Sequence, residues 1–239
     1  MAGAVHLSRS TWRQPWPLAA NSARQAVLRA IAARILSLGD RRVRVAIDGR
    51  TAAGKTTLGH EVAQLLADDG RVVLRASLDD FKQPWAESHL YDRTTGDGYY
   101  RNAYDLAAAR TLLLEPVTAT GSGQVALCSI DPITQVDHSG TCVAMPEDGV
   151  LIVDGVFTLR PELRDLWDLR VWVEVDPERS VRRGTRRDAE REGAQQAEAL
   201  HRERYGIAED IYIAEADPLA RADVVVDNNA FDRPRLLRS

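Results

Sequence analysis

Past residue 40, short apolar runs alternate with longer stretches in which apolar residues recur every three or four positions. The runs at 149–155 (GVLIVDG) and 169–176 (LRVWVEVD) are nearly continuous, which is typical of strands buried on both faces of a sheet. Turn-forming residues bound each run. The strands predicted in this way are 42–48, 71–77, 123–131, 149–155, 169–176 and 222–228.

Stretches with helical character separate these strands. Residues 58–70 end at a glycine, residues 103–116 are stopped by a proline, and residues 177–193 are strongly charged. Strands that alternate with helices predict an α/β fold with a doubly wound, mostly parallel sheet.

The N-terminal residues follow a different pattern. Residues 1–20 contain tryptophans and prolines without a helical or strand period, so we expect an irregular arm. A helix is predicted after it, because Ser22 and Gln25 resemble a capping box and Gly39 stands where a C-terminal glycine belongs.

Size and composition narrow the class of protein. A chain of 239 residues suits one domain with a small appendage, so we expect an arm and helix at 1–40 and the main domain at 41–239. The net charge of −4 argues against a nucleic-acid-binding coat, and no apolar run approaches a membrane span. Cys128 and Cys142 lack metal-type spacing and predict free thiols, with a disulfide between them as the alternative. We therefore expect a cytoplasmic protein without nucleic-acid or membrane partners, with homo-oligomerisation left open.

Residues 49–56, GRTAAGKT, carry the spacing of a phosphate-binding loop between a predicted strand and a helix. Glycines let backbone N–H groups turn toward phosphate oxygens, and the helix start adds the positive end of its dipole. We expect Lys55 to neutralise the β- and γ-phosphates of ATP and the Thr56 hydroxyl to ligate Mg²⁺. The predicted nucleotide-binding residues are Gly49, Thr51, Ala52, Ala53, Gly54, Lys55, Thr56 and Thr57.

Acidic residues follow two of the predicted strands. Asp79 and Asp80 come directly after the strand at 71–77, at the sheet edge where ligands bind in such folds. Asp79 can accept a proton from a hydroxyl that takes the γ-phosphoryl group, and Asp154 can reach Mg²⁺ or its waters. Each aspartate could instead serve only a turn or a helix cap. No Asn-Lys-x-Asp motif for guanine occurs, which favours a small-molecule phosphotransferase over a GTPase.

The charged stretch predicts a helical lid at about 177–206. Arg183 and Arg187 share one helix face, and guanidinium groups match phosphate oxygens. A solvated helix paired with its own acidic residues is the alternative. The stretch carries five arginines, namely Arg182, Arg183, Arg186, Arg187 and Arg191.

These motifs resemble the uridine kinase branch of the phosphoribulokinase/uridine kinase family of P-loop kinases. The resemblance runs from residue 42 to residue 229. It implies a P-loop fold with a five-stranded parallel sheet, flanking helices, a β-hairpin insertion near 123–148, and a helical arginine-bearing lid. It also implies that Asp79 is the catalytic base and that Arg187 contacts phosphates. The matching motifs are the phosphate loop, Ser77-x-Asp79-x-Phe81, Asp154-Gly155, Arg187-Asp188 and ADVVVDN at 222–228.

The sequence departs from the family mainly where the acceptor would bind. Lys82 replaces an aromatic residue, Asp154 replaces a glutamate, Tyr99 replaces the acid that binds ribose hydroxyls, and Arg204 replaces a glutamine. An anionic acceptor would suit Arg204 and Arg101. Each position could also be merely structural. The predicted acceptor contacts are Asp80, Lys82, Asp97, Tyr99, Tyr100, Arg101, Asp105, Arg204 and Tyr205.

The sequence therefore predicts an ATP- and Mg²⁺-dependent kinase for a small-molecule hydroxyl. By resemblance the acceptor is a nucleoside such as uridine or cytidine. A sugar, a vitamin precursor or a specialised metabolite is the alternative acceptor. Two other classes stay open: a regulatory protein that binds ATP without transferring phosphate, and an ATPase stimulated by a macromolecular partner.

Overall fold

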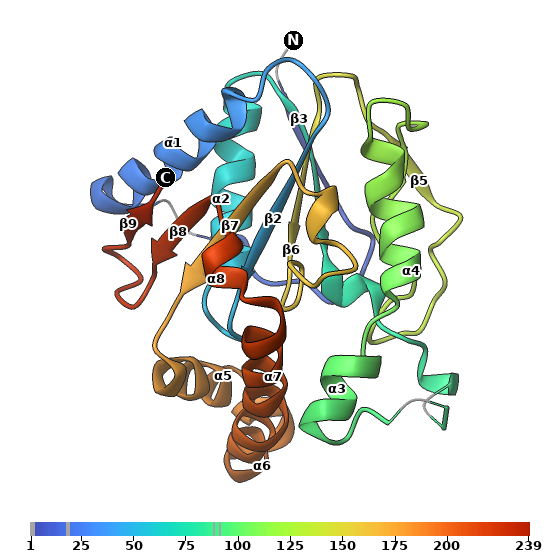
Figure 1. The fold of residues 1–239 in the computed structure, drawn as a ribbon, viewed down its shortest axis with the longest axis vertical. Helices are drawn as coiled ribbons and strands as arrows, with labels where there is room; N and C mark the ends of the chain where they lie inside the picture. The colour runs from blue at the N-terminus through green and yellow to red at the C-terminus, as the bar shows by residue number, and fades with distance from the viewer. Residues whose placement is uncertain (1–2, 18–19, 88, 91) are drawn as a thin grey trace.

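The computed structural model describes residues 3–17, 20–87, 89–90 and 92–239. A seven-stranded sheet forms its centre, in the order β1-β3-β6-β2-β7-β8-β9 (Figure 1). Every neighbouring pair is parallel except β8 and β9. The strands are β1 (Ala4–Leu7), β2 (Val43–Gly49), β3 (Val72–Ser77), β6 (Val150–Asp154), β7 (Leu169–Glu174), β8 (Val224–Asp227) and β9 (Arg235–Arg238).

The α/β fold and its mostly parallel sheet confirm the prediction, with two differences at the edges. The five expected strands form the centre, and β1 and β9 extend the sheet beyond them. The expectation of an irregular arm was wrong for residues 4–7, because Ala4 pairs in register with Val72 of β3. Four residues are too few to show a strand period in the sequence.

The predicted strand at 123–131 is shorter than expected and lies outside the main sheet. Only β4 (Gln124–Ala126) is a strand there, and it pairs antiparallel with β5 (Cys142–Ala144). The expected hairpin insertion is therefore present.

Alternate residues of the central strands face two separate cores. In β6, Val150 and Ile152 pack toward one core, and Leu151 and Val153 pack toward the other. This alternation follows from the two-residue period of a strand, and it explains why these strands have no polar face. The first core includes apolar residues of α1 (Ser22–Leu36) and α2 (Lys55–Asp68). The second includes residues from the region of α3 (Gly96–Asn102), α4 (Leu106–Ala108) and α7 (Ile207–Ala216) (Figure 1).

The helices cover both faces, with local caps that set their starts. Asn21, not Ser22, caps α1, since its side chain accepts the N–H of Arg24. Asp105 caps α4 by accepting the N–H of Ala108, so the predicted helix at 103–116 starts at Leu106 and continues as a π-helical stretch. The helices are α1 (Ser22–Leu36), α2 (Lys55–Asp68), α3 (Gly96–Asn102), α4 (Leu106–Ala108), α5 (Pro177–Glu192), α6 (Ala194–Ala199), α7 (Ile207–Ala216) and α8 (Pro218–Arg221).

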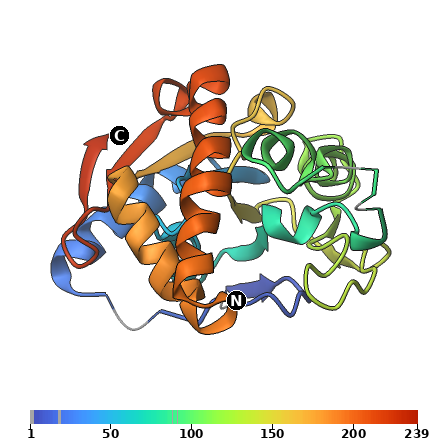
Figure 2. The same cartoon turned by 90° about the horizontal axis from the view of Figure 1, so that it is seen from below.

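The carboxyl ends of β2, β3 and β6 meet at one sheet edge, which α5, α6 and α7 adjoin (Figure 2). The phosphate loop follows β2, Asp79 and Asp80 follow β3, and Asp154 is the last residue of β6. Among the described residues, no helix combines the length and the apolar character needed to cross a bilayer.

Candidate active site

The phosphate loop joins β2 to α2 through two glycines with positive φ. Gly49 has φ 147° and Gly54 has φ 97°, and the helix begins at Lys55. A Cβ atom at Gly49 would collide with the carbonyl of Val173, so the loop backbone packs too closely on β7 for another residue. The Lys55 ammonium donates to the carbonyls of Gly49 (3.0 Å) and Arg50 (2.8 Å). Its position inside the loop is where it could meet phosphate oxygens.

Asp48 fixes the start of this loop, and the sequence analysis missed it. Its buried carboxylate accepts from the N–H of Gly49 at 2.6 Å, from the Tyr212 hydroxyl at 2.6 Å, and from the Thr158 hydroxyl at 2.9 Å. Burial raises the pKa of Asp48, against the lowering effect of the hydrogen bonds from the Tyr212 hydroxyl and from the N–H groups of Leu159 and Gly49. The signal was available, because an aspartate that directly follows the apolar run 45–47 of a buried strand needs several buried donors.

Burial also acts on Lys55. It lowers the pKa of the ammonium, while the carboxylates of Glu209 and Asp48 raise it. Glu209, on α7, accepts the backbone N–H of Thr51 and pairs with Arg50, so that α7 holds the first residues of the loop after Gly49.

Asp154 and Thr56 form the candidate metal position. The Thr56 hydroxyl donates to Asp154 Oδ2 at 2.5 Å. Arg75 of β3 takes the other oxygen, with Nη2 2.6 Å from Oδ1. A hydroxyl and a carboxylate oxygen beside a phosphate loop are ligands that Mg²⁺ accepts, so these residues fit the metal that the resemblance implies.

Asp79 lies on a short 3₁₀ turn that follows β3. Ser77 caps the turn by accepting the N–H of Asp79. Asp79 Oδ1 lies 3.0 Å from the Lys82 ammonium and accepts the Tyr104 hydroxyl at 2.9 Å. Burial alone would raise the pKa of Asp79, but Lys82 and Tyr104 outweigh it and lower the pKa. The carboxylate is therefore ionised at neutral pH. The Asp79 side chain is 29% exposed.

Asp80 is placed differently from its neighbour. Its side chain is buried on the side of the N-terminal arm, and its carbonyl accepts both the N–H and the hydroxyl of Ser129. Burial raises the pKa of Asp80 to about 7, against the lowering effect of the Ser10 and Ser8 hydroxyls.

Three tyrosines gather beside Asp79. Tyr99 and Tyr104 lie with their hydroxyls 3.3 Å apart, and the rings of Tyr99 and Tyr205 have centroids 5.1 Å apart. Tyr99 and Tyr205 were predicted as acceptor contacts, whereas Tyr104 was not. Only the three-dimensional arrangement brings Tyr104 onto the carboxylate, since 25 residues separate the two.

Two predicted arginines of α5 line the same cavity. Arg183 donates to the carbonyls of Asn228 (3.1 Å) and Asn229 (2.9 Å). Arg187 forms two hydrogen bonds with Asp188, each 2.9 Å long, and His201 Nε2 lies 2.9 Å from the same carboxylate. Asp188 therefore orients the Arg187 guanidinium. Because two N–H groups of Arg187 are bound to Asp188, fewer of them are free to bind phosphate.

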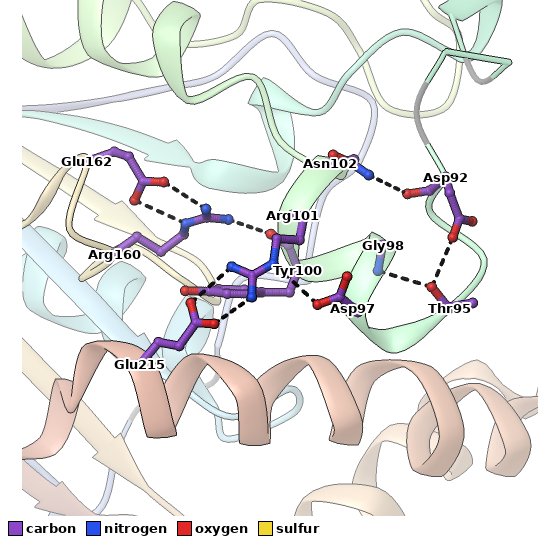
Figure 3. Close-up of polar contacts among 10 residues, drawn as sticks. All are labelled: Asp92, Thr95, Asp97, Gly98, Tyr100, Arg101, Asn102, Arg160, Glu162 and Glu215. Atoms are coloured by element: carbon purple, nitrogen blue, oxygen red, sulfur yellow. Dashed lines mark hydrogen bonds and ion pairs between the residues drawn. The ribbon is translucent and has the colours of Figure 1, made fainter.

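Several predicted acceptor residues lie elsewhere. Asp97, Tyr100, Arg101, Asp105 and Arg204 are not among the described residues that line the cavity. Figure 3 shows Arg101 paired with Asp97 on its own helix and with Glu215 of α7. Tyr100 is buried in the core, with the guanidinium of Arg160 over its ring.

Arg204 packs behind the cavity wall. Its guanidinium lies 5.3 Å from the ring centroid of Tyr99, and it donates to the Tyr205 hydroxyl at 2.6 Å. The two arginines that suggested an anionic acceptor are thus engaged by other residues, and neither lines the cavity.

The cavity measures about 940 Å³ and unites the phosphate loop with Asp79, Asp154 and the α5 arginines. The N-terminal arm forms part of its wall through Trp12, Arg13 and Trp16. Trp16 stacks on His60 of α2, and Arg191 of α5 lies over the ring of Trp12. The mostly parallel sheet with flanking helices and a small antiparallel hairpin is a P-loop kinase-like fold.

Comparisons with known proteins narrow the class. No family model matches the chain. It is 24% identical to the uridine kinase of Clostridium novyi over 154 residues, 64% of this chain and 71% of that protein. It is 27% identical to uridine-cytidine kinase C of Dictyostelium discoideum over 157 residues, 65% of this chain but only 32% of that protein. The chain is a distant relative of the uridine kinases.

Solved structures show the same fold. A possible uridine kinase from Bacillus stearothermophilus has a TM-score of 0.63 at 24% identity, covering 84% of this chain and 98% of its own. A putative fructose transport system kinase from Silicibacter has a TM-score of 0.65 at 20% identity, covering 79% and 93%. The D-glycerate 3-kinase of Cryptococcus neoformans has a TM-score of 0.57 at 13% identity, covering 92% and 100%.

Proposed function

We propose that this chain is an ATP- and Mg²⁺-dependent kinase that transfers the γ-phosphoryl group to a hydroxyl of a small molecule. The observation that carries the proposal is the position of Asp79, an ionised and partly exposed carboxylate in the same cavity as the phosphate loop. Relatives named as kinases with an alcohol acceptor support it. Uridine and cytidine are the first acceptors to test, because distant relatives are named for them.

Each residue has a role in this proposal. The loop N–H groups and Lys55 bind the triphosphate, and Thr56 with Asp154 would hold Mg²⁺, which neutralises charge on the phosphates when bound. Asp79 accepts the proton of the attacking hydroxyl. The hydroxyl oxygen forms a bond to the γ-phosphorus while the bond to the bridging oxygen of ADP breaks. Arg183 and Arg187 stabilise the charge on the transferring group.

The test is ADP release from Mg-ATP with a panel of nucleosides, sugars, hydroxy acids and vitamin precursors. Wild type and Asp79→Asn are compared, with Asp97→Asn as a matched control because the Asp97 side chain is 65% exposed and is not among the described residues that line the cavity. The proposal expects acceptor-dependent turnover that Asp79→Asn abolishes and Asp97→Asn preserves. Nucleotide binding without acceptor-dependent turnover would favour the regulatory class instead.

A second candidate is a kinase for an acceptor other than a nucleoside. The observation that favours it is Tyr99, which stands where the family has its ribose-binding acid and which lies between Tyr104 and Tyr205. Turnover with a non-nucleoside alcohol and none with uridine or cytidine would select this candidate.

A further inference from the structure

A buried histidine lies behind the arginine-bearing helix α5. His201 belongs to the π-helical stretch Leu200–Gly206, is 2% exposed, and is not among the described residues that line the cavity. Its Nε2 atom lies 2.9 Å from Asp188 Oδ2. π-Helical turns are rare and often occur at functional sites. The contact between His201 and Asp188 therefore calls for an explanation beyond packing.

The charge of Asp188 determines which group donates in this contact. Burial alone would raise the pKa of Asp188, but the hydrogen bonds from His201 and Arg187 outweigh it and lower the pKa. Asp188 is therefore ionised at neutral pH, and an ionised carboxylate only accepts hydrogen bonds. The Nε2 atom of His201 must carry a proton and donate to Oδ2.

Asp188 links His201 to Arg187. The Nη2 atom of Arg187 donates to the same Oδ2 atom, and its Nε atom donates to Oδ1, each at 2.9 Å. Arg187 lines the cavity. Burial alone would lower the pKa of Arg187, but Asp188, and then the charge of Asp79, outweigh it and raise the pKa. The guanidinium that Asp188 holds thus lies within electrostatic reach of the proposed base.

The fold leaves space for the imidazole on one side and packs it on the other. Gly184 is buried one turn before Asp188 on α5, and a Cβ atom there would collide with the His201 ring. Glycine is a poor helix former, and this packing explains its place inside a helix. The rings of His201 and Tyr205 have centroids 5.1 Å apart and meet edge to face at 73°. Tyr205 lines the cavity, so His201 is held between α5 and the cavity wall.

We propose that His201 is a positioning residue for phosphoryl transfer: its N–H holds Asp188, and Asp188 holds the Arg187 guanidinium toward the transferring group. The inference rests on the proposed function for the role of Arg187. A displacement of about 1 Å in a group at the reacting centre can cost about 100-fold in rate. A residue that never contacts the substrate thus sets kcat through the residues that it holds.

Two substitutions of His201 separate positioning from packing. His201→Leu fills the space but removes the N–H, whereas the amide of His201→Gln can again donate to Asp188. With the best acceptor, His201→Leu is expected to lower kcat about 10- to 100-fold and to change KM by less than about threefold. His201→Gln is expected to restore most of kcat. Glu203→Gln, at an exposed position of the same π-helical stretch, is the control and is expected to match the wild type.

A double-mutant cycle with Arg187→Met shows whether His201 acts through the arginine. In the Arg187→Met background, His201→Leu is expected to lower kcat by less than about twofold, because no guanidinium is left to orient. A loss by the same factor in both backgrounds would show that only the packing of His201 matters, and would overturn the inference. A wild-type kcat in His201→Leu would also overturn it.

Nucleotide binding separates this inference from the proposed function. Calorimetry compares Mg-ADP with the magnesium complex of an ATP analogue that carries an imido group between its β- and γ-phosphorus atoms. His201→Leu is expected to weaken binding of the analogue about tenfold relative to ADP, and His201→Gln is expected to restore the wild-type ratio. If the wild type phosphorylates no acceptor, the proposed function fails and this ratio still tests whether His201 holds Arg187 toward the γ-phosphate. An equal ratio in wild type and His201→Leu would then overturn the inference.

Discussion

Arg75 of β3 lies with Nη2 2.6 Å from Asp154 Oδ1 of β6, and both side chains are buried within the sheet. The same guanidinium donates to the carbonyls of Ile152 (2.8 Å) and Ala76 (3.1 Å). The carboxylate proposed for Mg²⁺ is thus already balanced by a cation of the protein, and its second oxygen is directed to Thr56.

Removal of Arg75 should destabilise the fold. Arg75→Met leaves Asp154 buried without its charge partner, and breaking a buried pair in this way typically costs about 3–5 kcal/mol of unfolding free energy. Urea unfolding followed by circular dichroism measures the loss. Arg101→Met breaks a half-exposed pair and is expected to cost less than about 1 kcal/mol. Similar losses in the two variants would contradict the role assigned to Arg75.

Asp79→Asn should reduce kcat for the best acceptor by about 10²- to 10⁴-fold, the range typical of a general base. Asparagine keeps the volume but cannot accept the hydroxyl proton. Affinity for Mg-ATP, measured by calorimetry, should change little, because Lys55 and the loop bind the phosphates. A normal kcat in this variant would exclude Asp79 as the base.

Lys82 should set the pH at which kcat/KM begins to fall on the acid side of its pH profile. In the wild type the lowered pKa of Asp79 keeps the carboxylate ionised from pH 5 to 8, so no loss of kcat/KM due to Asp79 is expected in that range. Lys82→Met removes the ammonium, burial then dominates, and the pKa rises. The variant should therefore lose activity as the pH falls, starting at a higher pH than the wild type.

Lys82→Arg is the control for charge, since it keeps a cation beside Asp79. Its acid limb should stay close to that of the wild type. An unshifted limb in Lys82→Met would show that Lys82 does not govern the protonation of Asp79.

His60 should make stability depend on pH. Burial, and then the charge of Arg75, lowers the pKa of His60 to about 4 in the folded protein. In the unfolded chain His60 takes up a proton near its ordinary pKa of about 6.5, whereas in the folded protein the ring stays neutral down to about pH 4. The folded protein therefore keeps its full stability above pH 6.5 and becomes less stable as the pH falls from 6.5 toward 4. At pH 5 the loss amounts to roughly 2 kcal/mol.

The measurement is the unfolding free energy at pH 7.5 and pH 5 for wild type and His60→Phe. Phenylalanine keeps a ring against Trp16 and removes the titrating group. The loss of unfolding free energy between pH 7.5 and pH 5 should be smaller in His60→Phe than in the wild type by roughly 2 kcal/mol. An equal pH dependence in both proteins would contradict the assignment.

The fold was predictable to a large extent because its signals are local. The apolar runs of β2, β6 and β7 reflect burial on both faces, and the loop glycines reflect the positive φ that they adopt. The nucleotide-binding residues also stand in one continuous segment. Whether they bind ATP as predicted awaits the binding measurements.

The acceptor side was predicted less well because its parts are distant in the sequence. Asp97, Tyr100 and Arg101 lie on the same short helix as Tyr99, and a sequence read without the fold cannot tell which of them faces the cavity. Tyr104 and Trp85 reach the cavity only through the packing of separate elements.

The sequence by itself determined the α/β architecture, the glycine loop after β2 and the aspartates at the carboxyl ends of β3 and β6, because strand period, glycine conformation and helix starts depend on neighbouring residues. Only the tertiary structure decided that β1 joins the sheet, that Arg75 balances Asp154, and that the arm forms a wall of the cavity. These relationships link residues dozens of positions apart, and their energies come from burial and charge pairing that arise only when the chain is folded.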